Sequence, residues 1–272
     1  MAYVPMIARI SSLPPLPESI LKLETLYAQG APEINDLVVI IESDPSLTAD
    51  MLAKVNAPLY SFSRQIVSIL QAVTLFGSTQ IRAMVLSSAM QRNFDIDMLP
   101  YDLSTSDFAR VSQMQSELMF QWYMSIDVDK AKVMTPIAFL METGKILVAR
   151  DVLDREKSIE FITDFRSYED VSAVENIHIM MTSAQINALL FEHWQLNTLF
   201  VDCMKYLDDE YDMPLAIKPF VRALQIVRTA VNVKEQFSEN SMARADELVQ
   251  ESDYDVDHFN KILKRVKAKY LR

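Results

Sequence analysis

The stretch that decides the fold lies in the first 60 residues and reads LPPLP at residues 13–17, IIESDPSLTA at 40–49 and VNAPLY at 55–60. Asp44 before Pro45 predicts a helix start, because an Asp oxygen can accept from the first free backbone N–H groups and Pro lacks an N–H that would go unpaired. Asn56 and Pro58 predict the helix end, since Pro disfavours a helical residue before it and Asn tolerates the left-handed conformation of a helix terminus. We therefore expect a capped helix from Asp44 to about Asn56.

Helical periodicity continues on both sides of this stretch. Apolar residues recur at i, i+3, i+4 and i+7 within residues 34–41 and again within 217–224, which gives each segment one apolar face. Gly77 followed by Ser78 is typical of one helix end and the next helix start. With only three glycines in the chain, the glycine-rich phosphate loops of dinucleotide-binding folds are disfavoured. The sequence predicts an all-α protein.

Further helices are expected along the rest of the chain. A first helix should run from about Glu18 to Gly30, and longer ones are predicted at residues 106–125, 130–152, 182–194 and 218–233. Residues 154–175 are rich in charge and predict either an irregular insertion or short helices. A last helix carries an apolar stripe and should dock on the body of the chain, or else serve as a partner-binding or membrane-surface helix; the stripe consists of Phe259, Ile262, Leu263, Val266 and Tyr270.

A polar, helix-breaking connection between residues 95 and 105 predicts a subdomain boundary. We expect an N-terminal helical subdomain over residues 1–97, a second helical subdomain over 98–240 and a helical tail over 241–272.

Charge and composition limit the class of protein. The 272 residues carry a formal net charge of −11, so a generic nucleic-acid surface is not expected. The single Cys203 excludes an intrachain disulfide and a multi-cysteine metal site, which fits a reducing cytosol. We recognise no signal peptide in residues 1–9 and no apolar stretch of about 18 residues. A cytoplasmic protein that binds neither nucleic acid nor membrane is expected.

The opening motifs resemble those of HDOD domains, which are all-helical signalling modules related to the HD-type metal phosphohydrolases. The family pattern has a Leu-Pro-x-Leu-Pro entry, an Asp-Pro-x-Leu-Thr helix start and an Asn-Ser-x-x-Tyr exit, and its positions fall here on Pro17, Asp44, Pro45 and Asn56. Residues 186–196 resemble the family's Leu-Leu-x-x-Trp-x-Leu segment, with Trp194 expected in the core. The resemblance implies a multi-helix HD-like fold with two helical subdomains and a C-terminal helix.

The same resemblance locates the metal ligands of HD-type enzymes. FLMETGKILVA at residues 139–149 is similar to the family's Leu-Leu-His-Asp-Ile-Gly-Lys helix and retains Gly144 and Lys145, but the His-Asp pair is replaced by Met141 and Glu142. The other ligand positions fall near Arg110, Thr182 and Thr229. A thioether, a guanidinium and two hydroxyls cannot hold a catalytic dication. The resemblance therefore implies no metal, and we expect no other cofactor.

A retained scaffold with missing ligands implies a non-enzymatic signal-transduction module. It would bind a signalling protein partner or a small ligand through the degenerate HD-like pocket or through the groove between its helical halves. The candidate ligand-binding residues are Arg110, Glu142, Lys145, His178 and Thr182.

The same residues indicate which class of ligand to expect, and they also leave open an alternative function. Arg110 and Lys145 offer donors where a dication would supply positive charge, so a small anion is expected, unless Arg110 pairs with Glu142 and the cavity is filled. The alternative function is a metal-dependent phosphohydrolase of nucleotides or cyclic dinucleotides, with an unrecognised ligand set that includes Glu142 and His178. The three histidines share no metal-ligand spacing, and each is expected to be an ordinary histidine.

Overall fold

The computed structural model describes residues 3–30, 32–57, 60, 64–92, 94 and 96–270, which form helices joined by turns and loops. Within these residues there is no β-strand, and only an isolated bridge joins Val231 to Gln236. The all-α prediction is confirmed. The chain forms two compact units: unit 1 comprises residues 1–13 and 96–272, and unit 2 comprises residues 14–95. The three-part division expected from the sequence stays a prediction.

Unit 2 is a set of short helices packed around one long helix. Its helices are α2 (Glu18–Ala28), α3 (Ile34–Glu42), α4 (Pro45–Val55) and α5 (Ile69–Arg92). Helices α3 and α4 both pack on α5, and α2 packs on α3. Leu23, Leu37 and Leu47 are fully buried at these contacts. Of the apolar stripe predicted within residues 34–41, Leu37 and Ile41 are buried, whereas Ile34 at the start of α3 is exposed.

Asp44 is the N-cap of α4, as the sequence predicts. Its Oδ1 accepts from the backbone N–H of Leu47 at 2.9 Å, and Pro45 is the first residue of the helix. Its Oδ2 accepts from the Ser19 hydroxyl of α2, also at 2.9 Å. The carboxylate therefore does two things that the motif alone does not reveal: it caps α4 and ties α4 to α2.

Asn56 ends α4, but the expected left-handed conformation is wrong, since its φ is −92°. The side chain is used instead to join two segments. Nδ2 donates to the carbonyl oxygens of Leu52 and Ile66, and Oδ1 accepts from the N–H of Ile66, each at 2.8 Å. The two bonds to Ile66 hold the end of α4 against the segment that leads into α5, and the bond to Leu52 closes the last turn of α4. Pro58, part of the same motif, lies outside the described residues.

Gly77 kinks α5, with φ 77° and ψ 157°, a conformation that is essentially restricted to glycine. This confirms the predicted break.

The sequence also led us to expect no stretch apolar enough to cross a membrane, and that expectation needs correction. Residues 69–89 of α5 qualify by length and hydropathy, but 61% of the qualifying window is buried, because α5 is the helix on which α3 and α4 pack.

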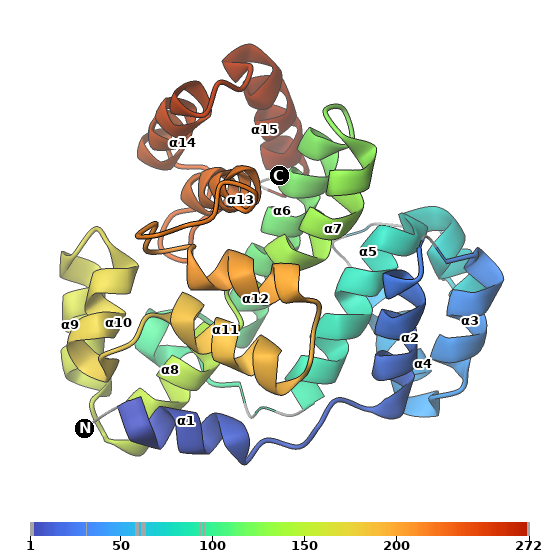
Figure 1. The fold of residues 1–272 in the computed structure, drawn as a ribbon, viewed down its shortest axis with the longest axis horizontal. Coiled ribbons are helices and arrows are strands. Elements are labelled where there is room, and N and C mark those ends of the chain that lie inside the picture. Colours follow the sequence, from blue (N-terminus) through green and yellow to red (C-terminus); the bar gives the residue numbers. More distant parts are fainter. Residues whose placement is uncertain are drawn as a thin grey trace. The chain divides into compact units, whose positions relative to one another are not determined.

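Unit 1 contains the remaining helices (Figure 1). They are α1 (Tyr3–Ser11), the 3₁₀ turn η2 (Leu99–Tyr101), α6 (Thr105–Tyr123), α7 (Val128–Leu140), α8 (Gly144–Asp154), α9 (Ser158–Ser167), α10 (Val171–Ile179), α11 (Ser183–His193), α12 (Thr198–Lys205), α13 (Lys218–Ala230), α14 (Glu239–Glu251) and α15 (Val256–Tyr270). Helix α11 packs on α8 and α12, and α6 packs on α7, α13 and α15.

Three sequence expectations about unit 1 can be compared with the structure. The single helix expected over residues 130–152 is wrong, because a turn at Met141–Thr143 separates α7 from α8. The charged segment 154–175 forms short helices rather than an irregular insertion, and these are α9 and the first half of α10. Trp194, expected in the core, is 2% exposed and ends α11.

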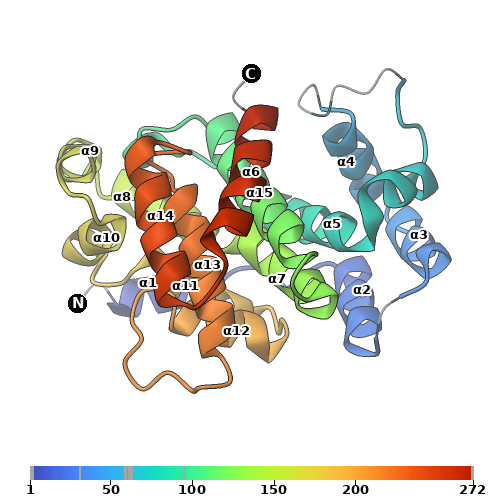
Figure 2. The ribbon, with the colours of Figure 1, turned by 90° about the horizontal axis from the view of Figure 1, so that it is seen from above.

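The C-terminal helix α15 docks on α6, which confirms the structural alternative for this segment (Figure 2). All five residues of its apolar stripe are buried. The Phe259 ring lies edge-on to Trp122 of α6, with ring centroids 4.8 Å apart. The Tyr254 hydroxyl, just before α15, hydrogen-bonds to that of Tyr123 at 2.6 Å. The stripe is therefore part of the core of unit 1.

Replacing Asp44 by Ala should lower the free energy of unfolding by about 1 kcal/mol, because it removes the cap of α4 and leaves the apolar contacts intact. Urea unfolding of the purified chain measures this difference. Glu42→Ala is the control, since Glu42 is an exposed carboxylate two residues away. Equal stabilities of the two variants would show that the cap does not stabilise the chain.

Candidate functional site

The backbones of α8 and α11 lie in direct contact near the buried polar residues of unit 1. Gly144 begins α8, and a Cβ atom placed there would lie 2.0 Å from the carbonyl oxygen of Ser183. Only glycine permits this approach. Asn187 of α11 is fully buried and donates from Nδ2 to the carbonyl of Leu140 at 2.8 Å. These contacts fix the turn that carries Glu142 and Lys145 directly against the start of α11.

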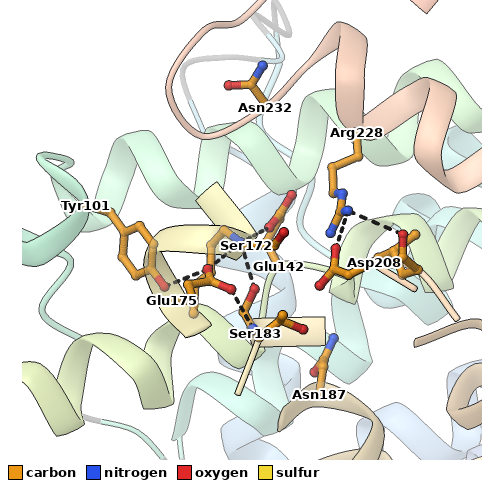
Figure 3. A network of polar contacts seen from close by, with 12 residues as sticks. Tyr101, Glu142, Ser172, Glu175, Ser183, Asn187, Asp208, Arg228 and Asn232 are labelled. Atoms are coloured by element: carbon orange, nitrogen blue, oxygen red, sulfur yellow. Dashed lines mark hydrogen bonds and ion pairs between the residues drawn. The ribbon is translucent and has the colours of Figure 1, made fainter. Parts of the chain in front are cut away.

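Lys145 lies at the middle of a buried polar cluster with Tyr101, Glu142, Glu175 and Ser183. Figure 3 labels these four partners. Its Nζ is 3.0 Å from Oε2 of Glu142 and 2.9 Å from Oε1 of Glu175 on α10, and it donates to the Ser183 hydroxyl at 2.7 Å. The Tyr101 hydroxyl donates to the same oxygen of Glu175 at 2.8 Å. All five side chains are buried. We call these five residues the Lys145 cluster; it joins η2, α8, α10 and α11 through one ammonium group.

Glu142 is also held from the side of α6. Gln115 is fully buried and donates from Nε2 to Oε1 of Glu142 at 2.9 Å and to the carbonyl of Val231 at 2.8 Å. The carboxylate thus has an amide on one oxygen and an ammonium near the other. One glutamine, Gln115 of α6, therefore joins the α7–α8 turn to the residue that follows α13.

A second charged pair lies beside the cluster, between Arg228 of α13 and Asp208 (Figure 3). The Arg228 guanidinium contacts Oδ1 of Asp208. It also lies at 3.5 Å from the carbonyl of Leu207. The pair contributes one positive and one negative charge to a region that already contains Glu142, Lys145 and Glu175.

These charges shift the pKa values of the group. Burial of Glu142 opposes ionisation, but the positive charges of Lys145 and Arg228 outweigh it and hold the pKa of Glu142 below its ordinary value. Burial likewise opposes ionisation of Asp208, and Arg228, assisted by the Thr182 hydroxyl, lowers the pKa of that carboxyl. Burial lowers the pKa of Lys145, but the carboxylates of Glu142 and Glu175 raise it by more, so the ammonium stays charged.

Tyr101 completes the cluster as a neutral donor. Burial and the neighbouring charge of Glu175 raise the pKa of its hydroxyl well above the ordinary value, so the proton remains on the phenol. The Lys145 ammonium also lies 5.7 Å from the centre of the Tyr101 ring. The cluster is an internally compensated set of ions, in which each charged group has a partner of opposite sign.

A cavity of about 380 Å³ opens beside the cluster. Glu142 and Lys145 line its floor together with Arg228 and Thr229. The segment that leads into α10, the residues just after α13 and one side of α14 line the rest, with Glu169, Asp170, Val171, Ser172, Asn232, Val233, Arg244, Glu247, Leu248 and Glu251. The cavity lies entirely within unit 1. It is the place where a small group could reach Glu142.

The structure brings together only part of the expected ligand-binding set. Glu142 and Lys145 line one cavity. Thr182 lines an adjoining one of about 290 Å³, and it caps α11 through a reciprocal pair of hydrogen bonds with Gln185. Arg110 is elsewhere: its guanidinium donates to the carbonyl of Tyr270 at the end of α15. The expected position of Arg110 beside Glu142 is therefore wrong, and so is the alternative in which Arg110 pairs with Glu142. Glu142 pairs instead with Lys145, the other candidate cation, and the charge of Arg228 also acts on it.

His178 is likewise outside the Lys145 cluster. Its Nε2 is 2.8 Å from a carboxylate oxygen of Asp164 on α9, and its ring packs near Phe161. His193 donates from Nε2 to the carbonyl of Leu13, and His258 bonds to the Ser125 hydroxyl. The three histidines hold separate pieces of unit 1 together.

The residues at the HD-type ligand positions do not fit a divalent ion. Met141 is fully buried in the apolar core, and Thr182 is committed to capping α11. Thr229 offers a hydroxyl at the cavity wall, which is a weak ligand compared with a carboxylate. In the part of the chain that the structure describes, no three His, Cys, Asp or Glu side chains are grouped to hold a metal. Glu142 alone keeps a suitable oxygen, and Lys145 already neutralises it.

The pattern of the HDOD domain matches residues 13–210. The chain belongs to the HDOD domain family. The match starts at the Leu13–Pro17 motif and takes in α8, α10 and α11, so the HDOD region contains Glu142, Lys145, Glu175 and Ser183. It ends before Arg228, which lies in the helical segment that follows. A search among curated proteins found no match.

Solved structures similar to this HDOD chain share its helical fold. A virulence factor from Campylobacter jejuni is 22% identical with a TM-score of 0.61, and the match covers 100% of this chain and 97% of that one. A candidate phosphohydrolase from Shewanella amazonensis is 15% identical with a TM-score of 0.73, covering 98% and 95%. A candidate signal transduction protein from Marinobacter aquaeolei is 17% identical with a TM-score of 0.74, covering 99% of this chain and 63% of that one. At these identities the similarity shows the fold alone.

Replacing Lys145 by Met should lower the free energy of unfolding by about 3–5 kcal/mol, because Glu142 and Glu175 would remain buried without their shared cation. Chemical unfolding measures the loss. The matched control is Lys157→Met, which removes a surface pair with Glu160 at 2.8 Å and should change the stability far less, because solvent screens exposed pairs. Comparable losses in the two variants would contradict the central role of Lys145.

The contribution of Glu142 should depend on pH. Because its pKa in the folded chain lies below the ordinary value of 4.5, the unfolded chain binds more protons between the two values, and stability falls as the pH is lowered. The contribution is complete above pH 4.5 and is lost as the pH falls through the folded pKa.

Glu142→Gln should therefore be less stable than the wild type by about 1–3 kcal/mol at pH 7, and the difference should shrink on acidification below the ordinary pKa of 4.5. Urea unfolding at a series of pH values gives the measurement. Glu33→Gln, at an exposed position of unit 2, is the control. A difference that is constant down to the acid transition would argue against an ionised Glu142.

Proposed function

We propose that this HDOD chain is a non-catalytic signal-transduction module of the cytoplasm, which binds a partner protein or a small ligand at the cavity beside the Lys145 cluster. The observation that carries the proposal is the environment of Glu142. This carboxylate stands at the position of an HD-type metal ligand, but its charge is compensated by Lys145 and its second oxygen accepts from Gln115. An HD-derived pocket built in this way favours recognition over catalysis.

The other residues around the cavity support the same interpretation. The positions that would complete a metal shell carry side chains with structural roles, as Met141 and Thr182 show. The cavity nevertheless remains open, at about 380 Å³, which is within the range of roughly 300–1,000 Å³ typical of small-ligand sites. A filled pocket would support a purely structural role; an open one supports binding.

The solved structures are compatible with a signalling role. The protein from Marinobacter aquaeolei is named as a candidate signal transduction protein, and it is longer than this chain, which spans 63% of it. The alternative function, a phosphohydrolase, has its own relative in the protein from Shewanella amazonensis. The two functions differ in whether Glu142 coordinates a bound dication, and metal content and hydrolytic activity distinguish them.

The purified full chain should contain well below one equivalent of Mn, Fe, Ni or Zn, and it should not hydrolyse phosphomonoesters, phosphodiesters or cyclic dinucleotides when these metals are added. The reason is that Met141, Thr182 and Thr229 supply no carboxylate or imidazole ligand. Elemental analysis and assays with nitrophenyl phosphates measure both. Restoring His at 141 and Asp at 142 should not create activity.

Glu142→Gln provides the control for the assays, since it removes the only suitable oxygen donor among the HD-type ligand positions. Hydrolysis by the wild type that needs added Mn and is abolished in Glu142→Gln would overturn the proposal in favour of the phosphohydrolase.

A further inference from the structure

The cavity beside the Lys145 cluster has walls from two helical hairpins of unit 1. Helices α9 and α10 form one hairpin, and α13 and α14 form the other (Figure 1). Residues 169–172 of the first hairpin line the cavity on one side, and residues between 228 and 251 of the second hairpin line it on the other. Any contact that joins the two hairpins at the surface therefore narrows the way into the cavity.

Two polar contacts join the hairpins at the surface, and we call them the strap. The Arg244 guanidinium of α14 lies 2.8 Å from a carboxylate oxygen of Glu169, and both residues line the cavity. The Lys234 ammonium donates to the carbonyl of Tyr168 at 2.6 Å and lies 5.2 Å from the centre of the Phe165 ring. Within residues 96–270, which the structure describes without a gap, no other hydrogen bond or ion pair joins the two hairpins.

The strap is exposed, unlike the charged groups at the floor of the cavity. The side chains of Arg244 and Glu169 are 51% and 81% exposed. Those of Lys145 and Glu175 are 5% and 0% exposed. Exposed ion pairs stabilise a fold only weakly because water and salt screen them, whereas breaking a buried pair is costly. The strap can therefore open while the floor stays intact.

We propose that the strap gates the cavity, so that a ligand or a partner side chain reaches Glu142 and Thr229 when Arg244 and Glu169 separate. This inference rests on the proposed function and describes how access to its site is regulated. A molecule that binds either member of the pair holds the strap open, because that side chain exchanges its partner across the mouth for the bound molecule.

The proposal is tested with a cysteine inside the cavity. Thr229→Cys places a thiol on the cavity wall, and the natural Cys203 is fully buried, so the rate of reaction with N-ethylmaleimide reports on access to position 229. In this background the double variant Glu169→Gln, Arg244→Gln should react at least about threefold faster, because it removes the exposed pair and leaves the net charge unchanged. Ser172→Cys, on the opposite wall, is a second reporter and should give the same order of rates.

Two further double variants of Thr229→Cys are the controls. Glu169→Arg with Arg244→Glu restores the pair in reverse, and it should return the rate to that of Thr229→Cys alone. Asp129→Asn with Lys132→Gln removes a comparable exposed pair within α7, at 2.9 Å and away from the cavity. That change should leave the rate as it is in Thr229→Cys.

The gate is overturned if loss of the pair leaves the labelling rate unchanged, if the α7 control accelerates labelling equally, or if the reversed pair reacts as fast as the double glutamine variant. Absence of labelling at both reporter positions in every variant also overturns it. Equal rates at a reactive cysteine would show an accessible cavity without a gate and would leave the binding function intact. Metal-dependent hydrolysis by the wild type would remove the binding function whatever the labelling rates.

Discussion

The structure of unit 1 depends on one buried ammonium. Lys145 lies among two carboxylates and a hydroxyl that come from the α7–α8 turn, α10 and α11. Removing three ionised groups from water is expensive, and the cost is offset only when their geometry lets each charge meet an opposite one. The approach of Gly144 to Ser183 supplies that geometry. Backbone packing and charge compensation therefore require each other in this region.

The cluster also explains how a scaffold with HD-like motifs can exist without its metal ligands. A dication in such a pocket would bring positive charge to the carboxylate at position 142. Here Lys145 and Arg228 bring it, as the lowered pKa of Glu142 reflects. Because Lys145 and Arg228 belong to the chain itself, the carboxylate at position 142 is compensated without a bound ion.

Sequence patterns predicted the elements whose cause is local. The cap at Asp44, the kink at Gly77 and the apolar stripe of α15 each follow from a few neighbouring residues. The ion pairs within the site, by contrast, join residues that lie far apart in the sequence. Glu175 lies 30 positions from Lys145, and Arg228 lies 20 from Asp208, so no spacing rule links them. The available signal was the lysine itself: a cation inside the apolar run of residues 144–149 must have acidic partners, but the sequence does not say which acids fold against it.

A cation that is part of the chain, such as the Lys145 ammonium, differs in one respect from a bound metal ion, which can dissociate. The free energy of unfolding of a metal-dependent fold depends on the concentration of free metal in the cell, because an ion that binds only the folded state stabilises it by mass action. The ammonium of Lys145 is present at one per chain by covalent attachment, and its pairs with Glu142 and Glu175 need no exchangeable component. The stability that these pairs contribute to unit 1 therefore does not depend on the supply of free metal and is not removed by a chelator.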